Sequence, residues 1–257
     1  MRQKMKKFLF LLAAVAVLTS CVQLERGGKR VAKKMPLNGF ERIEVNGVVD
    51  VKYVQSDSFF VRVSAPERLA SKVTARVEGR QLIVGSDGAD GQLNLQNLTI
   101  NINHDDGIVF YVGSPDLTAV TVNGSGDFEC EQRLDTDRLS ILLKGSGDVE
   151  FHDIICDHIT VSLIGSGDVE VKHVEAQTSS VELIGSGDVE MGLYKVGETR
   201  LQLRGSGDIE ASFADCRQVE AHIAGSGDIE LKGDVDRLTS SVAGSGDLHT
   251  KKLRVKK

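Results

Sequence analysis

The residues with the clearest potential for chemistry are aspartates that recur in one short motif. The tetrapeptide Gly-Ser-Gly-Asp occurs seven times, and its aspartates are Asp127, Asp148, Asp168, Asp188, Asp208, Asp228 and Asp247. Two residues after the aspartate lies a glutamate in six copies and His249 in the seventh. Regularly spaced carboxylates can bridge calcium ions, cap backbone N–H groups or, as a pair, cleave a glycosidic bond.

The regularity of these carboxylates argues against catalysis. Polysaccharide-cleaving enzymes need one special pair of acids, whereas here the same acids recur in every copy. The sequence contains no His-Glu-x-x-His motif and no Cys-x-x-Cys pair. We therefore expect no enzyme activity, no cofactor and no zinc site. Between the two remaining roles we favour capping, with each carboxylate accepting hydrogen bonds from Gly and Ser N–H groups of its turn, over calcium bridging.

The spacing of the motif predicts the fold. Successive copies, from Gly124 to Gly244, start 21, 20, 20, 20, 20 and 19 residues apart, and apolar residues lie two apart on both sides of most copies. Alternation with period two predicts strands, and a steady period predicts a solenoid. We expect an all-β chain whose main body is a right-handed, single-stranded β-helix of about seven 20-residue coils. Glycine at each corner permits a positive φ or a close backbone approach.

The first twenty residues have the features of a secretory signal. Four basic residues lie in Met1–Lys7, and the apolar run Phe8–Leu18 is eleven residues long, too short to cross a bilayer. The run ends in Leu18-Thr19-Ser20-Cys21, which resembles the bacterial lipobox. We predict that residues 1–20 are a lipoprotein signal peptide and that Cys21 is acylated, for example with palmitate. The protein would then be lipid-anchored in the cell envelope, at the bacterial outer membrane.

The rest of the chain divides by composition. We expect a flexible basic tether at residues 21–37, a smaller and irregular β module at 38–116, and the β-helix at 117–257 with a basic cap in Lys251–Lys257. Basic residues on a terminal strand discourage edge-to-edge growth, so the ectodomain should be a monomer or a small oligomer. Once Cys21 is acylated, three cysteines remain, and we expect reduced and mostly buried thiols at Cys130, Cys156 and Cys216.

Net charge excludes one class of partner. Removing residues 1–20 takes away four of the 31 basic residues and leaves all 37 acidic ones, so the mature chain has a net charge of −10. Binding to nucleic acid needs a basic face, so nucleic acid is not expected as a partner. The chain also has no Trp, which leaves little aromatic surface for stacking on sugars.

Several motifs together resemble the head GIN domain family. They are Phe40-x-x-Ile43 followed by the Asn46-Gly47 turn, the Pro115-Asp116-Leu117 step, and the serial Gly-Ser-Gly-Asp turns, and the match covers roughly residues 38–250. Members of this family are often labelled auto-transporter adhesins. The resemblance implies a β-helical head domain, a location in the cell envelope and contact with another surface.

These observations lead to one favoured function and two alternatives. We expect a non-enzymatic cell-envelope lipoprotein that presents a rigid, acidic β-helical surface for adhesion or binding. Its partners would be the membrane, through the lipid anchor, and a polysaccharide or protein of the envelope or of a host surface. The first alternative is an envelope scaffold that assembles by stacking, and the second is a polysaccharide-processing enzyme.

Cys21→Ser is expected to abolish acylation and to leave the chain uncleaved or soluble, because the acyl chains need the cysteine. Incorporation of labelled fatty acid and fractionation of membranes measure this directly. A Cys21→Ser chain that still takes up the label and sediments with membranes would contradict the lipobox assignment.

Overall fold

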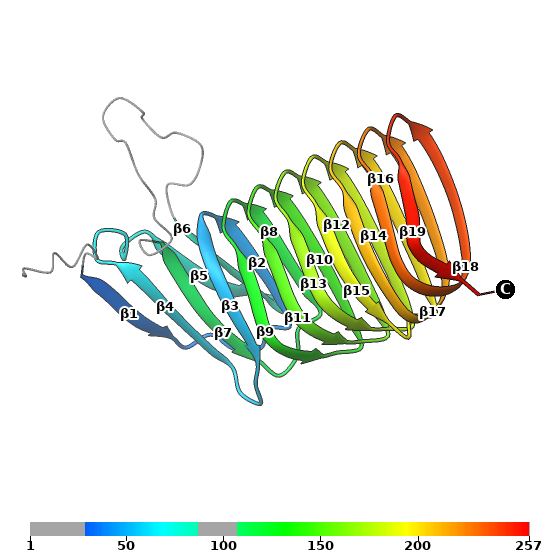
Figure 1. Cartoon of the computed structure of the whole chain (residues 1–257). Coiled ribbons are helices and arrows are strands. Elements are labelled where there is room, and N and C mark those ends of the chain that lie inside the picture. Colours follow the sequence, from blue (N-terminus) through cyan, green and yellow to red (C-terminus); the bar gives the residue numbers. More distant parts are fainter. Residues whose placement is uncertain (1–28, 87–106, 257) are drawn as a thin grey trace, which may run out of the picture.

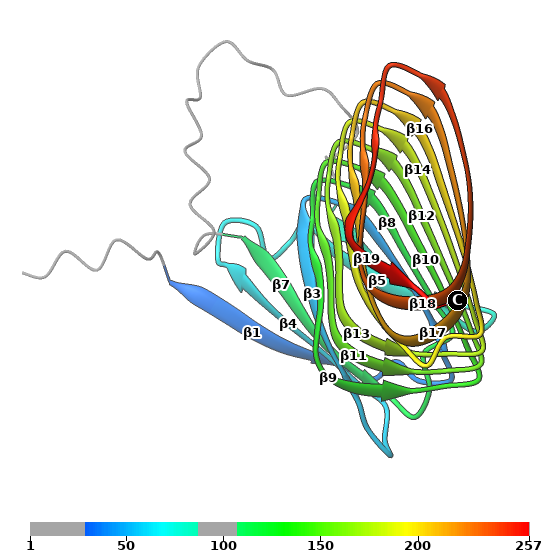
Figure 2. The ribbon, with the colours of Figure 1, turned by 45° about the vertical axis from the view of Figure 1, so that its right-hand side comes forward.

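The computed structural model describes residues 29–86 and 107–256, which form strands and no helix. The chain winds into a β-helix whose coils are flattened loops with two broad faces (Figures 1 and 2). Strands on one face lead into the Gly-Ser-Gly-Asp corners, and strands on the other face leave them. We call these the leading face and the trailing face. The predicted signal peptide, Cys21 and the first part of the expected tether lie outside the described residues.

The leading face contains, in spatial order, β5 (Val73–Glu78), β6 (Gln81–Ser86), β2 (Arg42–Gly47), β8 (Ala119–Gly124), β10 (Arg138–Gly145), β12 (His158–Gly165), β14 (Thr178–Gly185), β16 (Glu198–Gly205) and the second halves of β17 (Ile209–Gly225) and β18 (Ile229–Gly244). The trailing face contains β1 (Arg30–Met35), β4 (Phe60–Pro66), β7 (Ile108–Ser114), β3 (Val49–Gln55), β9 (Phe128–Asp135), β11 (Val149–Ile155), β13 (Val169–Glu175), β15 (Val189–Tyr194), the first halves of β17 and β18, and β19 (Leu248–Val255).

The repeating coils pair in parallel, with each residue opposite its equivalent one coil away. Leu143, Leu163, Leu183 and Leu203 form one such ladder on the leading face. Alternate residues point inward, so the space between the two faces is filled by ladders of Val, Leu and Ile that are almost fully buried. The predicted all-β solenoid of about seven coils is therefore confirmed.

The β-helix begins before the first full motif. On the leading face β2 pairs in parallel with β8, so that Gly47 lies opposite Gly124, and on the trailing face Val51 lies opposite Phe128. The segment from Gly47 to Asp50 is thus an eighth corner, in which valines replace Ser and the second Gly. A single hydrophobic core runs from Phe40 to Val235. The expected boundary at residues 116 and 117 consequently falls inside a continuous stack.

One part of the expected tether is ordered into a strand. Arg30–Met35 forms β1, which pairs antiparallel with β4, so the prediction of a flexible segment at 21–37 is wrong for these residues. Pairing gives the backbone of β4 a partner on its second edge, and Met35 packs against the core. The basic composition of the segment suggested a solvated linker, but its charged side chains project from the strand while its backbone is bound.

The basic end of the chain forms the last strand, β19. Two of its side chains pair with the coil before it: Lys252 Nζ lies 2.9 Å from Glu230 Oε1, and Arg254 pairs with Asp234. Lys256, directly after β19, lies with its Nζ 3.1 Å from Asp236 Oδ1. These charges therefore hold the terminal strand in place along the edge of the trailing face.

The second glycine of each motif is required by the closeness of neighbouring coils. Gly187 is buried, and a Cβ added to it would lie 1.9 Å from the carbonyl oxygen of Gly167 in the preceding coil. The first glycine has the same crowding and a positive φ as well, for example +140° at Gly185. Only a residue without a Cβ allows the corners to stack at the separation of hydrogen-bonded strands.

Gly187→Ala is expected to destabilise the fold by about 3 kcal/mol, because the new methyl group must push two coils apart. Ser186→Ala, at the exposed neighbouring position, is the matched control and should change stability by less than about 0.5 kcal/mol. Denaturant unfolding of the three proteins measures the difference. Equal stability of Gly187→Ala and the unaltered protein would contradict the close stacking.

Candidate functional site

The corners are joined to one another by their backbones. In each coil the Ser N–H donates to the carbonyl oxygen of the first Gly one coil earlier, and in every coil except that of Gly187 the N–H of the second Gly donates to the same oxygen. For example, Ser166 N lies 2.9 Å and Gly167 N lies 3.2 Å from Gly145 O. These two N–H groups are thus already satisfied without the aspartate.

The aspartates form a continuous ladder of side chain to backbone hydrogen bonds. In each corner the aspartate N–H donates to Oδ1 of the aspartate one coil earlier, at 2.7–3.2 Å. The ladder runs through Asp50, Asp127, Asp148, Asp168, Asp188, Asp208, Asp228 and Asp247. Every carboxylate from Asp50 to Asp228 therefore caps the next coil.

Capping by the aspartates was predicted correctly in kind, but the predicted donors were wrong. The donors are aspartate N–H groups of the next coil, not Gly and Ser N–H groups of the same turn. The physical reason is that the first Gly carbonyl already accepts from the Gly and Ser groups. In most corners the aspartate N–H is the backbone donor that has no carbonyl acceptor, and stacking places it beside the aspartate carboxylate of the preceding coil.

The ladder offsets the repulsion between its own charges. Carboxylates in neighbouring central coils, such as Asp168 and Asp188, repel by about 0.9 kcal/mol at 4.8 Å in water. A hydrogen bond to a charged acceptor contributes about 1.5–3 kcal/mol. One bond per coil is therefore enough to outweigh the repulsion without a bridging cation.

A second acidic row, on the trailing face, is compensated by lysines. Lys52 Nζ lies 2.6 Å from Glu129 Oε2, and this bond lowers the pKa of Glu129 and raises the pKa of Lys52. Lys172 lies 2.5 Å from Glu150 and 3.8 Å from Glu170. Lysine thus bridges neighbouring coils, a role that the Glu-x-Lys spacing in the sequence could have indicated.

The same pattern recurs toward the end of the chain. Lys232 pairs with Glu210 and lies 3.4 Å from Glu230, and the bond to Glu210 raises the pKa of Lys232. Glu190 alone in this row has no basic partner within the part of the chain that the structure describes. The seven aspartates and six glutamates of the motifs therefore form two rows with different partners, backbone N–H groups for Asp and lysines for all of the Glu residues except Glu190.

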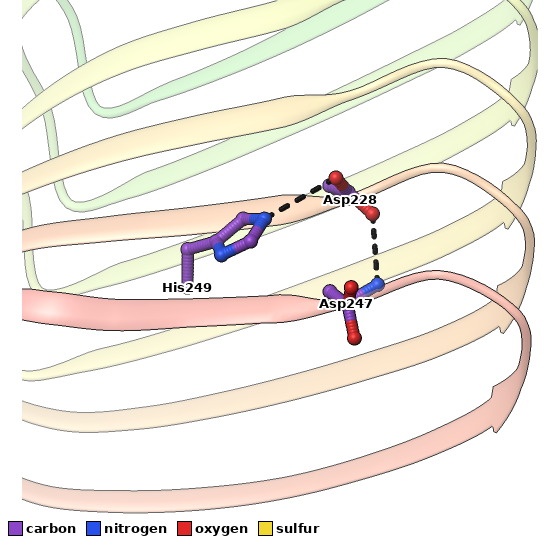
Figure 3. Close-up of side chains that lie close together, drawn as sticks. All are labelled: Asp228, Asp247 and His249. Atoms are coloured by element: carbon purple, nitrogen blue, oxygen red, sulfur yellow. Dashed lines mark hydrogen bonds and ion pairs between the residues drawn. The ribbon is translucent and has the colours of Figure 1, made fainter.

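The ladder ends in a cluster of Asp228, Asp247 and His249, whose potential ligand atoms lie within 4.8 Å of one another (Figure 3). Asp228 Oδ1 accepts the N–H of Asp247 at 2.8 Å, and Asp228 Oδ2 lies 3.2 Å from His249 Nε2. The first bond, and then the second, hold the pKa of Asp228 below its ordinary value. Both oxygens of Asp228 are occupied, and the cluster falls well short of the six to eight oxygens that calcium takes.

The three cysteines are buried and free, as the sequence predicted. Burial raises the pKa of the Cys130 thiol to about 12 and that of Cys156 to about 11. A thiol in this state is protonated at neutral pH and is a poor nucleophile. The lipidation candidate, Cys21, lies outside the described residues, so its acylation stays a prediction.

Comparison with known proteins assigns the chain to a family. It matches the model of the family described as "Putative auto-transporter adhesin, head GIN domain" over residues 39–215 and 194–257. The chain belongs to this head GIN domain family. The name describes adhesins, which act at the cell surface. No match was found among curated proteins.

Solved structures support the head GIN fold. A putative adhesin from Bacteroides fragilis is 24% identical with a TM-score of 0.74, and the match covers 86% of this chain and 96% of that one. A putative lipid binding protein from Parabacteroides distasonis is 24% identical with a TM-score of 0.69, covering 89% and 98%. A putative adhesin from Parabacteroides merdae is 23% identical with a TM-score of 0.63, covering 86% and 96%. The described part of this head GIN domain has no helix long and apolar enough for a membrane span.

Asp188→Ala should destabilise the fold by about 1–2 kcal/mol, because the N–H of Asp208 loses its acceptor. Asp188→Asn should lose less, since its amide oxygen still accepts that bond and the repulsion from neighbouring carboxylates is removed. Glu190→Ala, which removes an unpaired carboxylate, is the control. Thermal melts of the four proteins, with calcium and with a chelator, provide the measurement. A large drop in the melting temperature on removal of calcium would make the ladder a metal site instead.

Proposed function

We propose that this chain is a non-enzymatic lipoprotein of the bacterial outer membrane, anchored through Cys21, that uses its acidic β-helix to bind another surface. The lipobox supports the anchor, and membership in a family named for adhesins supports the binding role. The partner would be a polysaccharide or a protein of the envelope or of a host surface.

Rigidity suits the β-helix to this role. The coils pair in parallel, share one core and are joined at most corners by three hydrogen bonds to the preceding coil, for example from Ser166, Gly167 and Asp168. A surface that is already ordered loses little conformational entropy when it binds.

One surface stands out as the binding region, and we call it the hydroxyl face. It lies on the outside of β8, β10, β12 and β14, where the outward residues are mainly short hydroxyl and aliphatic side chains. Nine of the fifteen outward residues on these strands are of this kind: Thr121, Ser140, Leu142, Thr160, Ser162, Ile164, Thr178, Ser180 and Ile184. The other six are Ala119, Asn123, Arg138, Lys144, His158 and Glu182. Ile164 is 42% exposed. This face is the observation on which the proposal depends.

The trailing face is less suited to close contact. Its outward Glu and Lys side chains are long and paired with one another, so burying them would cost side-chain entropy and desolvation. Ser, Thr and Ile lose less entropy, and hydroxyl groups can donate and accept bonds with sugars or peptides. The aspartate ladder borders the hydroxyl face at the corner and would disfavour anionic partners.

Adhesion of cells that produce the full-length lipoprotein tests this proposal. Thr160→Arg with Ser162→Arg places two charges on the hydroxyl face. The double variant should lower the retention of cells, on the surface that cells with the unaltered protein bind, at least about tenfold, because an unpaired charge is costly to bury. His152→Arg with Ser212→Arg adds the same charge to exposed positions of the trailing face and is the control.

The readout is retention on a panel of immobilised envelope polysaccharides, host glycans and host-surface proteins. Cells without the protein should be retained no better than the Thr160→Arg, Ser162→Arg cells. Equal retention of cells with and without the protein across the panel would contradict the proposal, as would equal losses from the two double variants.

A further inference from the structure

The amino-terminal end of the trailing face carries a different surface from the coils. Strand register places Lys34 opposite Arg62, Arg62 opposite Tyr111, and Tyr111 opposite Lys52. The same line continues from Lys52 to Glu129 and then along the glutamate row. One outward row across the sheet therefore changes from basic and aromatic on β1, β4, β7 and β3 to acidic on the coils.

This surface is also hollowed. A depression of about 430 Å³ is lined by Ala32, Lys52, Val54, Phe60, Arg62, Val63, Ser64 and Tyr111. Tyr111 is 44% exposed, and the Arg62 guanidinium lies 5.5 Å from the centre of the Phe60 ring. We call Lys34, Lys52, Phe60, Arg62 and Tyr111 the basal patch.

The basal patch has cations that are not neutralised. Lys52 is paired with Glu129, but Lys34 and Arg62 have no carboxylate within ion-pair distance in the described part of the chain. Exposed Tyr and Arg side chains beside an apolar hollow are amphipathic. The ring of Tyr and the aliphatic stem of Arg can contact hydrocarbon, and the guanidinium of Arg can bind phosphate. The chemistry of the patch therefore matches an anionic lipid headgroup region.

The position of the patch points to the same partner. Strand β1 lies at the end of the molecule opposite to the carboxyl terminus (Figure 1). Eight residues lie between Cys21 and Arg30, and an extended chain over the nine residue steps spans at most about 30 Å. If Cys21 is acylated, as the proposed function requires, the patch lies within a short distance of the bilayer.

We propose that the basal patch docks on the anionic headgroups of the membrane that holds the lipid anchor. Lys34 and Arg62 contact lipid phosphates, and Tyr111 and Phe60 lie at the level of the headgroups, where aromatic rings are favoured. Docking fixes the orientation of the β-helix, with its acidic coils directed away from the negative surface. The anchor supplies proximity and the patch supplies orientation.

Vesicle binding by a chain that begins at Val22 tests the patch without the anchor. All strand pairings of the described fold lie within residues 30–255, so this chain keeps them. It should co-sediment with phosphatidylcholine vesicles that contain phosphatidylglycerol, should bind pure phosphatidylcholine much more weakly, and should be released by added salt.

Variants locate the binding. Lys34→Ser with Arg62→Ser should weaken binding to the anionic vesicles by about 30-fold, since each basic group at an anionic surface contributes several-fold. Arg138→Ser with Lys144→Ser removes the same charge from exposed positions of the leading face and should change binding by less than about twofold. Melting temperatures show that both variants are folded.

Three outcomes would overturn the proposal. They are equal binding to neutral and anionic vesicles, equal losses in the two double variants, and binding of a soluble acidic polysaccharide at the patch with no binding to vesicles. Because the test chain has no acyl group, its result is independent of whether Cys21 is lipidated and of what the hydroxyl face binds.

Discussion

Hydrogen bonding between stacked Gly-Ser-Gly-Asp corners is the constraint on which the rest of this structure depends. In most coils the carbonyl of the first glycine accepts two N–H groups from the next coil, and the neighbouring aspartate accepts a third. This contact is possible only because neither glycine carries a Cβ. Since it fixes each coil at one position relative to the last, it also sets the register of the core ladders and of every outward row.

The fixed register explains how the protein can repeat acidic residues in each coil. A stack of identical side chains would normally concentrate like charge. Here the aspartates accept hydrogen bonds from backbone N–H groups, and most of the glutamates form ion pairs with lysines that bridge two coils. On the leading face, the outer side of β8, β10, β12 and β14 carries mainly short hydroxyl and aliphatic side chains. The same ordering leaves Lys34 and Arg62 unpaired at the amino-terminal end, so the outward surfaces differ in chemistry although they share one architecture.

The repeat was predictable because each copy contains its own strand pattern and its own corner. The eighth corner was not recognised, since Val48 and Val49 replace the Ser and Gly that define the motif, although Gly47 and Asp50 keep their places. Strand β1 was missed because its partner, β4, lies about thirty residues away and only the folded chain brings the two together. The donor to each aspartate was assigned to the wrong residue for a similar reason. It depends on the offset between coils, which no single copy of the motif contains.

Amide hydrogen exchange at the aspartates tests the stacked corner most directly. Asp168, Asp188 and Asp208 lie at exposed turns, where an unbonded N–H would exchange as fast as in an unfolded chain. If each N–H is held by the carboxylate of the preceding coil, these amides should exchange as slowly as those of the paired strand β14, through opening of whole coils. Rapid exchange at the aspartates, alongside protection of β14, would contradict the account.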